Sequence, residues 1–140
     1  MIGIAWKDSY ATQVGCFDAE HKKLVSLIDQ YFQALREKRG LAMLEDLLGQ
    51  LLEYTVYHFA NEEKLMREHD YPHYQAHVVE HRKLAATVKG FRQMLGEAQG
   101  EQERDELLLV LRNFLREWLI GHISVEDKKY GPFFNEKGIF

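Results

Sequence analysis

Four long stretches of this sequence carry apolar residues at helical spacing, and only short joints separate them. In the first stretch, Leu24, Ile28 and Leu35 recur four and seven residues apart, as one face of a helix requires. The four stretches cover approximately residues 19–38, 41–68, 73–96 and 103–123. No segment shows the apolar-polar alternation of a half-buried strand. Short joints favour antiparallel neighbours, so the sequence predicts an all-α fold, an up-down-up-down antiparallel four-helix bundle.

Residues 1–17 precede the first stretch and are predicted to form an N-terminal arm. Trp6 and Tyr10 give this arm apolar side chains with which to pack on the bundle. Asp18 then stands where the N-cap of the first helix is expected. Because 140 residues are enough for one hydrophobic core, we expect residues 1–140 to form a single domain.

The charge pattern argues against several classes of partner. The formal net charge is -4, and no block of Lys and Arg could form a phosphate-binding face, which excludes nucleic acid. No run approaches the roughly 18 apolar residues of a membrane span, and the N-terminus lacks the pattern of a secretion signal. Cys16 has no disulfide partner. We therefore expect a cytoplasmic monomer with no membrane insertion.

Seven metal-capable side chains extend the apolar faces of the four stretches. They are His21, His58, Glu62, His77, His81, His122 and Asp127. Residues four apart on a helix share a face, so His58 with Glu62, and His77 with His81, can reach a common centre. Burying such a set without metal would leave polar groups unsatisfied at about 1–3 kcal/mol each. The remaining histidines, His69 and His73, lie at a joint and are expected to be exposed.

Depth along the bundle is an independent test of a shared site. His21 lies about 17 residues, or roughly 26 Å, before the end of its helix, and His58 lies about as far into the next one. Likewise, the number of residues from His81 to the end of its helix matches the number from the start of the last helix to His122. All four ligand sets are therefore expected at one level of the bundle.

Asp127 does not fit a regular helix. It follows His122 by five residues, which is about 500° of α-helix and leaves the two side chains on different faces. A π-type widening, or a helix that ends just after His122, would bring the carboxylate back to the site. We take this distortion as a hypothesis for the structure to test.

Counting ligands indicates which chemistry the site allows. Five imidazoles and two bridging carboxylates fill about nine of the twelve positions around two octahedral ions. A bridging oxo or hydroxo group would fill two more. One position is left, which suits a single diatomic ligand, and the imidazole-rich set favours iron over zinc.

At these residues the chain resembles the hemerythrin family, and specifically its single-domain bacterial members. The family pattern is a lone His on the first helix, then His-x-x-x-Glu, His-x-x-x-His and His-x-x-x-x-Asp. The matching residues are His21, His58 to Glu62, His77 to His81, and His122 to Asp127. The resemblance covers nearly the whole chain, including the Tyr71-Pro72 joint and Tyr130.

The resemblance implies a centre of two iron ions that binds dioxygen reversibly. One iron would be held by His77, His81 and His122, the other by His21 and His58, with Glu62 and Asp127 bridging. Oxygen would bind end-on, as a hydroperoxide, to the five-coordinate iron of the second group. The residues implied to line the oxygen pocket are Leu24, Phe59, Trp118, Leu119 and Ile123.

Two other functions are possible on the same scaffold. A di-iron oxidase, peroxidase or nitric-oxide-reducing enzyme would be expected to carry paired Glu-x-x-His motifs, which the ligand positions here lack. A sensor of oxygen, nitric oxide or redox state would need a separate partner to relay its signal. We therefore expect an oxygen carrier or store that is not an enzyme and that passes oxygen to an oxygen-consuming protein.

Overall fold

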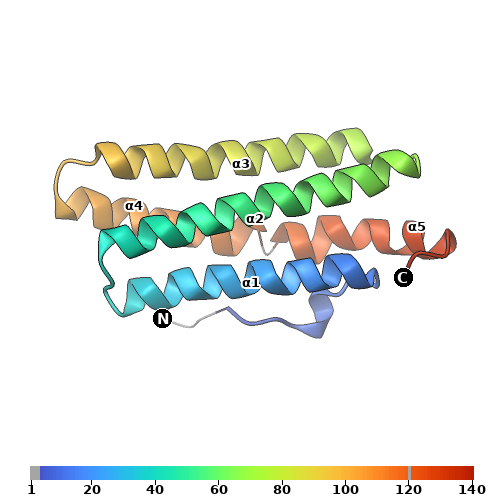
Figure 1. Ribbon diagram of the computed structural model, residues 1–140, viewed down its shortest axis with the longest axis horizontal. Coiled ribbons are helices and arrows are strands. Elements are labelled where there is room, and N and C mark those ends of the chain that lie inside the picture. The colour runs from blue at the N-terminus through green and yellow to red at the C-terminus, as the bar shows by residue number, and fades with distance from the viewer. Residues whose placement is uncertain (1–3, 120) are drawn as a thin grey trace.

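The computed structural model describes residues 4–119 and 121–140, with residue 119 described by its backbone alone. Its main elements are α1 (Gly15–Arg36), α2 (Leu41–Glu68), α3 (Tyr74–Glu97) and a fourth rod. The rod consists of α4 (Glu101–Phe114), π-helical segments Leu115–Leu119 and His122–Glu126, a 3-10 turn Asp127–Lys129, and α5 (Tyr130–Glu136). The four lie side by side (Figure 1). This arrangement confirms the predicted all-α four-helix bundle.

The fourth rod departs most from the prediction, which placed a helix over residues 103–123. Regular α-helix ends at Phe114, and the backbone then widens twice before α5 continues the rod. The Asp127 N–H donates to the carbonyl of His122, five residues earlier, which is the hydrogen bond of a π turn. The hypothesis of a distorted helix at Asp127 is therefore confirmed.

The first helix begins at Gly15, four residues before the predicted start, and Asp18 is not its N-cap. Asp18 lies in the first turn, where Oδ1 accepts hydrogen bonds from the Thr12 N–H and the Thr12 hydroxyl, both at 2.7 Å. The carboxylate therefore fixes the arm rather than the helix end. At its other end the helix stops at Arg36, before the predicted 38, because Lys38 has a left-handed φ of 53°.

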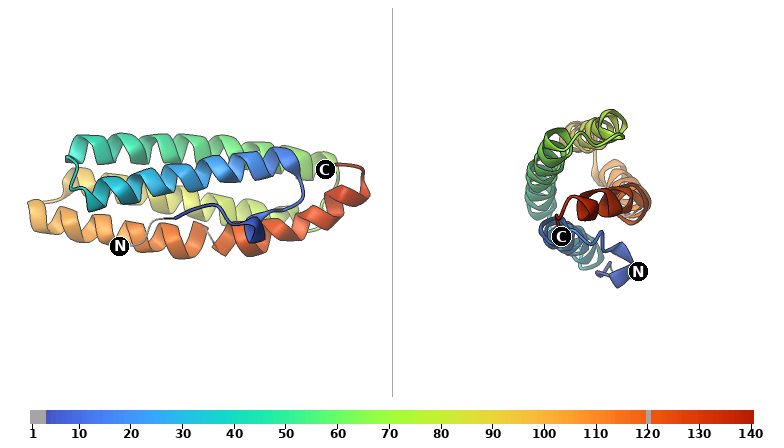
Figure 2. Two further views of the ribbon diagram at one scale, coloured as in Figure 1. Left: turned by 90° about the horizontal axis from the view of Figure 1, so that it is seen from below. Right: turned by 90° about the vertical axis from the view of Figure 1, so that its right-hand side faces the viewer.

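The N-terminal arm runs back along α1 and touches the fourth rod (Figure 2). Tyr10 is buried, and its ring meets Trp6 edge to face at 5.6 Å. The Lys128 ammonium donates to the Ser9 carbonyl at 3.0 Å. The arm is thus tied to both the first and the last quarter of the chain.

Apolar side chains form two buried clusters, and the metal-capable residues lie between them. The larger cluster runs through all four helices and includes Leu24 and Phe59, while the smaller one joins Phe17 and Phe134 near the C-terminus. The His58 ring contacts Phe59 of the first cluster at 5.9 Å and Phe17 of the second at 6.2 Å.

The two histidines at the joint differ in exposure. His73 is exposed, as expected, but His69 is half-buried. The prediction for His69 was wrong because α5 extends beyond the predicted end of the fourth helix, and Phe134 comes to 6.2 Å from the His69 ring.

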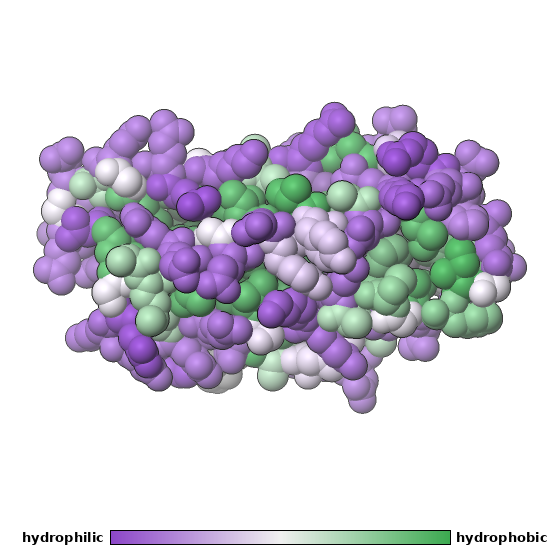
Figure 3. Space-filling view, in the orientation of Figure 1, coloured by the Kyte–Doolittle hydropathy of each residue, from purple (hydrophilic) through white to green (hydrophobic). Residues whose placement is uncertain are grey.

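The surface is mixed in polarity. Hydrophilic side chains are spread along the face shown in Figure 3, with smaller hydrophobic patches between them. Across residues 4–119 and 121–140, no helix combines the length and apolar character that crossing a membrane would require.

Candidate metal centre

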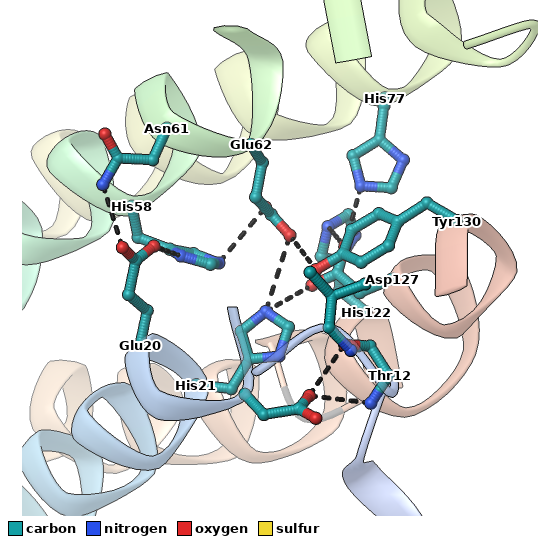
Figure 4. Close-up of polar contacts among 12 residues, drawn as sticks. Thr12, Glu20, His21, His58, Asn61, Glu62, His77, His122, Asp127 and Tyr130 are labelled. Carbon is teal, nitrogen blue, oxygen red and sulfur yellow. Dashed lines mark hydrogen bonds and ion pairs between the residues drawn. The ribbon is translucent and has the colours of Figure 1, made fainter. Parts of the chain in front are cut away.

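The seven side chains singled out by the sequence meet in the interior, and none is more than 4% exposed. Their elements are α1 for His21, α2 for His58 and Glu62, α3 for His77 and His81, and the irregular middle of the fourth rod for His122 and Asp127. Most of them appear in Figure 4, pointing toward one another from different helices. The common depth predicted from helix lengths is thus observed.

The ligand atoms divide into two sets. The three-histidine set contains His77, His81, His122 and Asp127, and the two-histidine set contains His21, His58, Glu62 and Asp127. Within each set, one atom from every residue lies within 4.8 Å of the others. Asp127 belongs to both sets.

The Asp127 carboxylate spans the two sets through different oxygens. Oδ1 lies 2.7 Å from His77 Nε2 and 3.0 Å from His122 Nε2, and Oδ2 lies 2.9 Å from His21 Nε2. One oxygen therefore faces each set, as a bridging carboxylate requires. The π turn produces this orientation, since it places Asp127 on the face of His122.

Glu62 also contacts both sets. Its Oε1 lies 3.2 Å from His58 Nε2 and 3.3 Å from His81 Nε2. Its Oε2 accepts a hydrogen bond from the Tyr130 hydroxyl at 2.6 Å. Burial and the Glu62 charge raise the pKa of Tyr130 well above its usual range, so this hydroxyl remains a donor.

Two further carboxylates contact histidine rings at Nδ1, the nitrogen that faces away from the site. Glu20 lies 2.6 Å from His58 Nδ1 and also accepts a bond from the Asn61 amide at 2.9 Å, and Glu63 lies 2.8 Å from His81 Nδ1. A proton on Nδ1 leaves the Nε2 lone pair directed into the site, which is the tautomer a metal needs.

The sequence did not reveal these supporting residues. Glu20 and Glu63 are each adjacent in sequence to a candidate ligand, which is a usable signal, but their partners lie on neighbouring helices. Tyr130 was noted only as a flanking feature of the family pattern.

The electrostatics of the site follow from its burial and its ion pairs. Burial lowers the pKa of His21, but contacts with Asp127 and Glu62 outweigh burial and raise it to about 10. Burial likewise lowers the pKa of His58, and mainly the Glu62 carboxylate raises it to about 9. Burial raises the pKa values of Glu62 and Asp127, but the surrounding histidines hold both well below their usual range. Metal would displace protons from these histidines.

The buried polar atoms fit a metal better than they fit one another. Among the described residues, five histidine nitrogens of the two sets are buried without an aligned hydrogen bond: Nε2 of His21, His58, His81 and His122, and Nδ1 of His21. Glu62 Oε1 and Asp127 Oδ2 are orphaned in the same way. Buried polar atoms are rarely left unpaired, and lone pairs aimed at a shared centre are what coordination uses.

The side chains predicted to line an oxygen pocket surround the site unevenly. Leu24, Phe59 and Ile123 are buried, and Phe59 stacks on His81 with ring centroids 3.7 Å apart. Trp118 is half-buried and stacks on His122 at 5.1 Å. The side chain of Leu119 lies outside the described residues. Their role toward oxygen stays a prediction.

Comparison with known proteins gives consistent matches over most of the chain. The family model described as the hemerythrin HHE cation binding domain matches residues 14–134. A bacteriohemerythrin of Pseudomonas aeruginosa strain LESB58 is 32% identical over 130 residues, covering 93% of this chain and 80% of that protein. A myohemerythrin of Sipunculus nudus is 25% identical over 125 residues, covering 89% and 88%. A crystal structure of wild-type hemerythrin superposes with a TM-score of 0.77 at 29% identity, covering 92% of this chain and 95% of that one.

Proposed function

Because this chain belongs to the hemerythrin family, we propose that it binds dioxygen reversibly at a pair of iron ions, as a carrier or store. The observation that carries the proposal is the meeting of five imidazoles and two carboxylates at one buried place, with orphaned Nε2 and carboxylate oxygen atoms. Imidazole with carboxylate is a ligand set that suits iron.

The two sets of side chains support one ion each. His77, His81 and His122 would hold the first iron, and His21 and His58 the second. Glu62 and Asp127 would bridge the ions, since each carboxylate contacts histidines of both sets. The count of two irons and the seven ligands are parts of this proposal.

The supporting residues would keep the site in a binding-competent form. Glu20 and Glu63 hold the rings of His58 and His81 with Nε2 inward, and Tyr130 fixes one oxygen of Glu62. Changes to such supporting groups commonly lower metal affinity by about 10–100-fold.

The apolar lining would protect bound oxygen. A ferrous pair supplies the two electrons that reversible oxygen binding requires. The buried side chains of Leu24, Phe59 and Ile123 would exclude water from the site, where protons would otherwise promote irreversible oxidation. End-on binding as a hydroperoxide stays a prediction from the family resemblance.

The ligand count favours binding over turnover. One coordination position is left after the protein ligands and a bridge are counted, which leaves little room for a second substrate. An oxidase or peroxidase, and a sensor acting through a separate partner, are the alternatives. Delivery to an oxygen-consuming protein and a monomeric state are predictions.

Iron counting with absorption spectra during oxygen addition and removal tests the proposal. We expect about two irons per chain and a reversible spectral change. His58→Ala should abolish the change, whereas His73→Ala, an exposed histidine outside both sets, should leave it intact. Rapid turnover with a reductant would favour the enzyme, and a chain that binds no iron would refute the proposal.

A further inference from the structure

A hollow lies beside the candidate metal centre, between α3 and the fourth rod. It is a pocket of about 520 Å³. Its walls include Tyr71, Ala76, His77, Glu80, Glu126 and Lys129. His77 is the one member of the three-histidine set among the residues that line it. The pocket therefore reaches the site at a single candidate ligand.

Among the described residues, His77 lacks the carboxylate that contacts Nδ1 of His58 and of His81. The Nδ1 atoms of His58 and His81 each face a carboxylate at 2.6 and 2.8 Å. Over the residues that the structure describes, His77 has only its bond from Nε2 to Asp127, and its Nδ1 has no hydrogen-bond partner in the protein. The His77 ring is buried and packs against the rings of Tyr71, His81, His122 and Tyr130, with centroids 4.8–6.4 Å apart, so it forms a fixed inner wall of the pocket.

The pocket is lined with oxygen donors. Glu80 and Glu126 bring two carboxylates to it, and both oxygens of Glu126 lie 3.1 Å from the Lys129 ammonium. Within the described part of the chain, the buried Tyr71 hydroxyl has no hydrogen-bond partner, and the residue as a whole is 5% exposed. Carboxylate and hydroxyl oxygens suit a hydrated divalent cation that has not yet reached its imidazole ligands.

The pocket does not suit dioxygen. The ion of the three-histidine set would have three imidazoles, two carboxylates and a bridge, which together fill an octahedron. An opening on this side therefore meets an ion with no free position. The two carboxylates, of which Glu126 pairs with Lys129 and Glu80 lies 3.9 Å from the exposed Lys83 ammonium, also suit a cation better than an apolar gas.

We propose that this pocket is the port through which ferrous iron enters and leaves the centre. Glu80 and Glu126 receive the hydrated ion, and His77 is the first imidazole that the ion meets. The proposal rests on the iron binding proposed above. A port changes the rates of uptake and release by the same factor and leaves the equilibrium iron content unchanged.

Filling the port is the first test. Ala76→Phe places a ring in the pocket, and Ala86→Phe, at an exposed position of the same helix outside the pocket, is the matched control. Uptake of ferrous ion by the iron-free chain, and release to a ferrous chelator, are followed by absorbance without oxygen. We expect both rates to fall by a common factor in Ala76→Phe alone, with unchanged iron content.

Charge variants test the same port without altering its shape. Glu80→Gln and Glu126→Gln should each slow uptake by about tenfold at low ionic strength, because attraction of the cation is lost, and salt should remove the difference. Lys129→Gln should speed uptake, since it frees Glu126. Glu53→Gln, exposed on α2 and outside the pocket, is the control and should match the unsubstituted chain.

The outcomes separate the two proposals. Normal iron content with unchanged rates in the charge variants would overturn the port and leave the metal centre standing, even if Ala76→Phe failed to fold. An unsubstituted chain that takes up no iron would overturn both.

Discussion

Helix α2 and the fourth rod each supply one histidine and one carboxylate, but by different backbone geometry. On α2, His58 and Glu62 are four residues apart on an uninterrupted α-helix. On the fourth rod, His122 and Asp127 are five apart, and a π turn brings them to one face. A five-residue spacing places two side chains on different faces of a regular helix, but on one face when the helix widens by one residue.

The widened part of the fourth rod also makes contacts with α2 and with the N-terminal arm. Just after the π turn, Tyr130 bonds to Glu62 on α2, and Gly131 packs so closely on the arm that a Cβ atom there would lie 2.0 Å from the Thr12 carbonyl oxygen. The residues that complete the site therefore also attach the arm and α5. The regular helix supplies candidate ligands, whereas the widened rod supplies candidate ligands and the contacts that enclose them.

The largest expected effect comes from removing either carboxylate. Asp127→Asn and Glu62→Gln should each lower iron affinity by more than ~100-fold, because each carboxylate contacts histidines of both sets. This loss exceeds the one expected for a supporting residue. Glu63→Gln, which loses only the partner of His81, is the control and should cost about 10–100-fold. Metal analysis after dialysis measures the loss. Full iron content in Asp127→Asn would mean that the widened rod contributes no bridge.

Single-residue deletions test the geometry itself. Deleting Val125, which is 55% exposed, would leave His122 and Asp127 four apart, as a regular helix needs, so iron affinity should stay within about tenfold. Deleting Ala60, exposed on α2, would turn Glu62 by about 100° relative to His58, and iron binding should be lost. Iron titration compares the two variants. Loss of binding in both would show that the π turn does more than set the spacing.

The stability of the iron-free chain should depend on pH, because buried histidines pair with buried carboxylates in α2 and in the fourth rod. The raised pKa values of His21 and His58 stabilise the fold fully below their unfolded value of about 6.5, and this contribution is lost as pH rises through about 9 and about 10. The lowered pKa values of Glu62 and Asp127 stabilise it above about 4, and this is lost as pH falls.

Urea unfolding of the iron-free chain between acid and alkaline pH measures this window. The midpoint should be highest between roughly pH 4.5 and 6.5 and should decline toward pH 10. Glu136→Gln, an exposed change in α5, should leave the profile unaltered. A midpoint that rose from neutral to alkaline pH would contradict the assigned ion pairs.

The smallest expected effect compares two glycines. Gly131→Ala should destabilise the fold by about 1–3 kcal/mol, because its Cβ would collide with the arm backbone. Gly90→Ala on α3, where a Cβ would meet nothing within 4 Å, should stabilise by about 0.5–1 kcal/mol through helix propensity. Denaturant unfolding gives both values. Equal effects of the two substitutions would refute close packing of the arm on the widened rod.

Much of the fold and site could be predicted because helical geometry is local and periodic. A spacing of four between His58 and Glu62 fixes their common face, and a rise of about 1.5 Å per residue fixes the depth of His21. The errors fell where contacts between elements decide. Asp18 binds Thr12 of the arm instead of capping α1, and His69 is half-buried because α5 reaches it.

By itself, the sequence determined four helices, seven metal-capable side chains and their common level, since each depends on spacing along one helix. The tertiary structure decided where Asp127 points, which carboxylates hold the histidine rings, and that Tyr130 bonds to Glu62. The physical reason is that a five-residue spacing is compatible with several backbone paths. Packing against other helices and the arm selects the one path that closes the site.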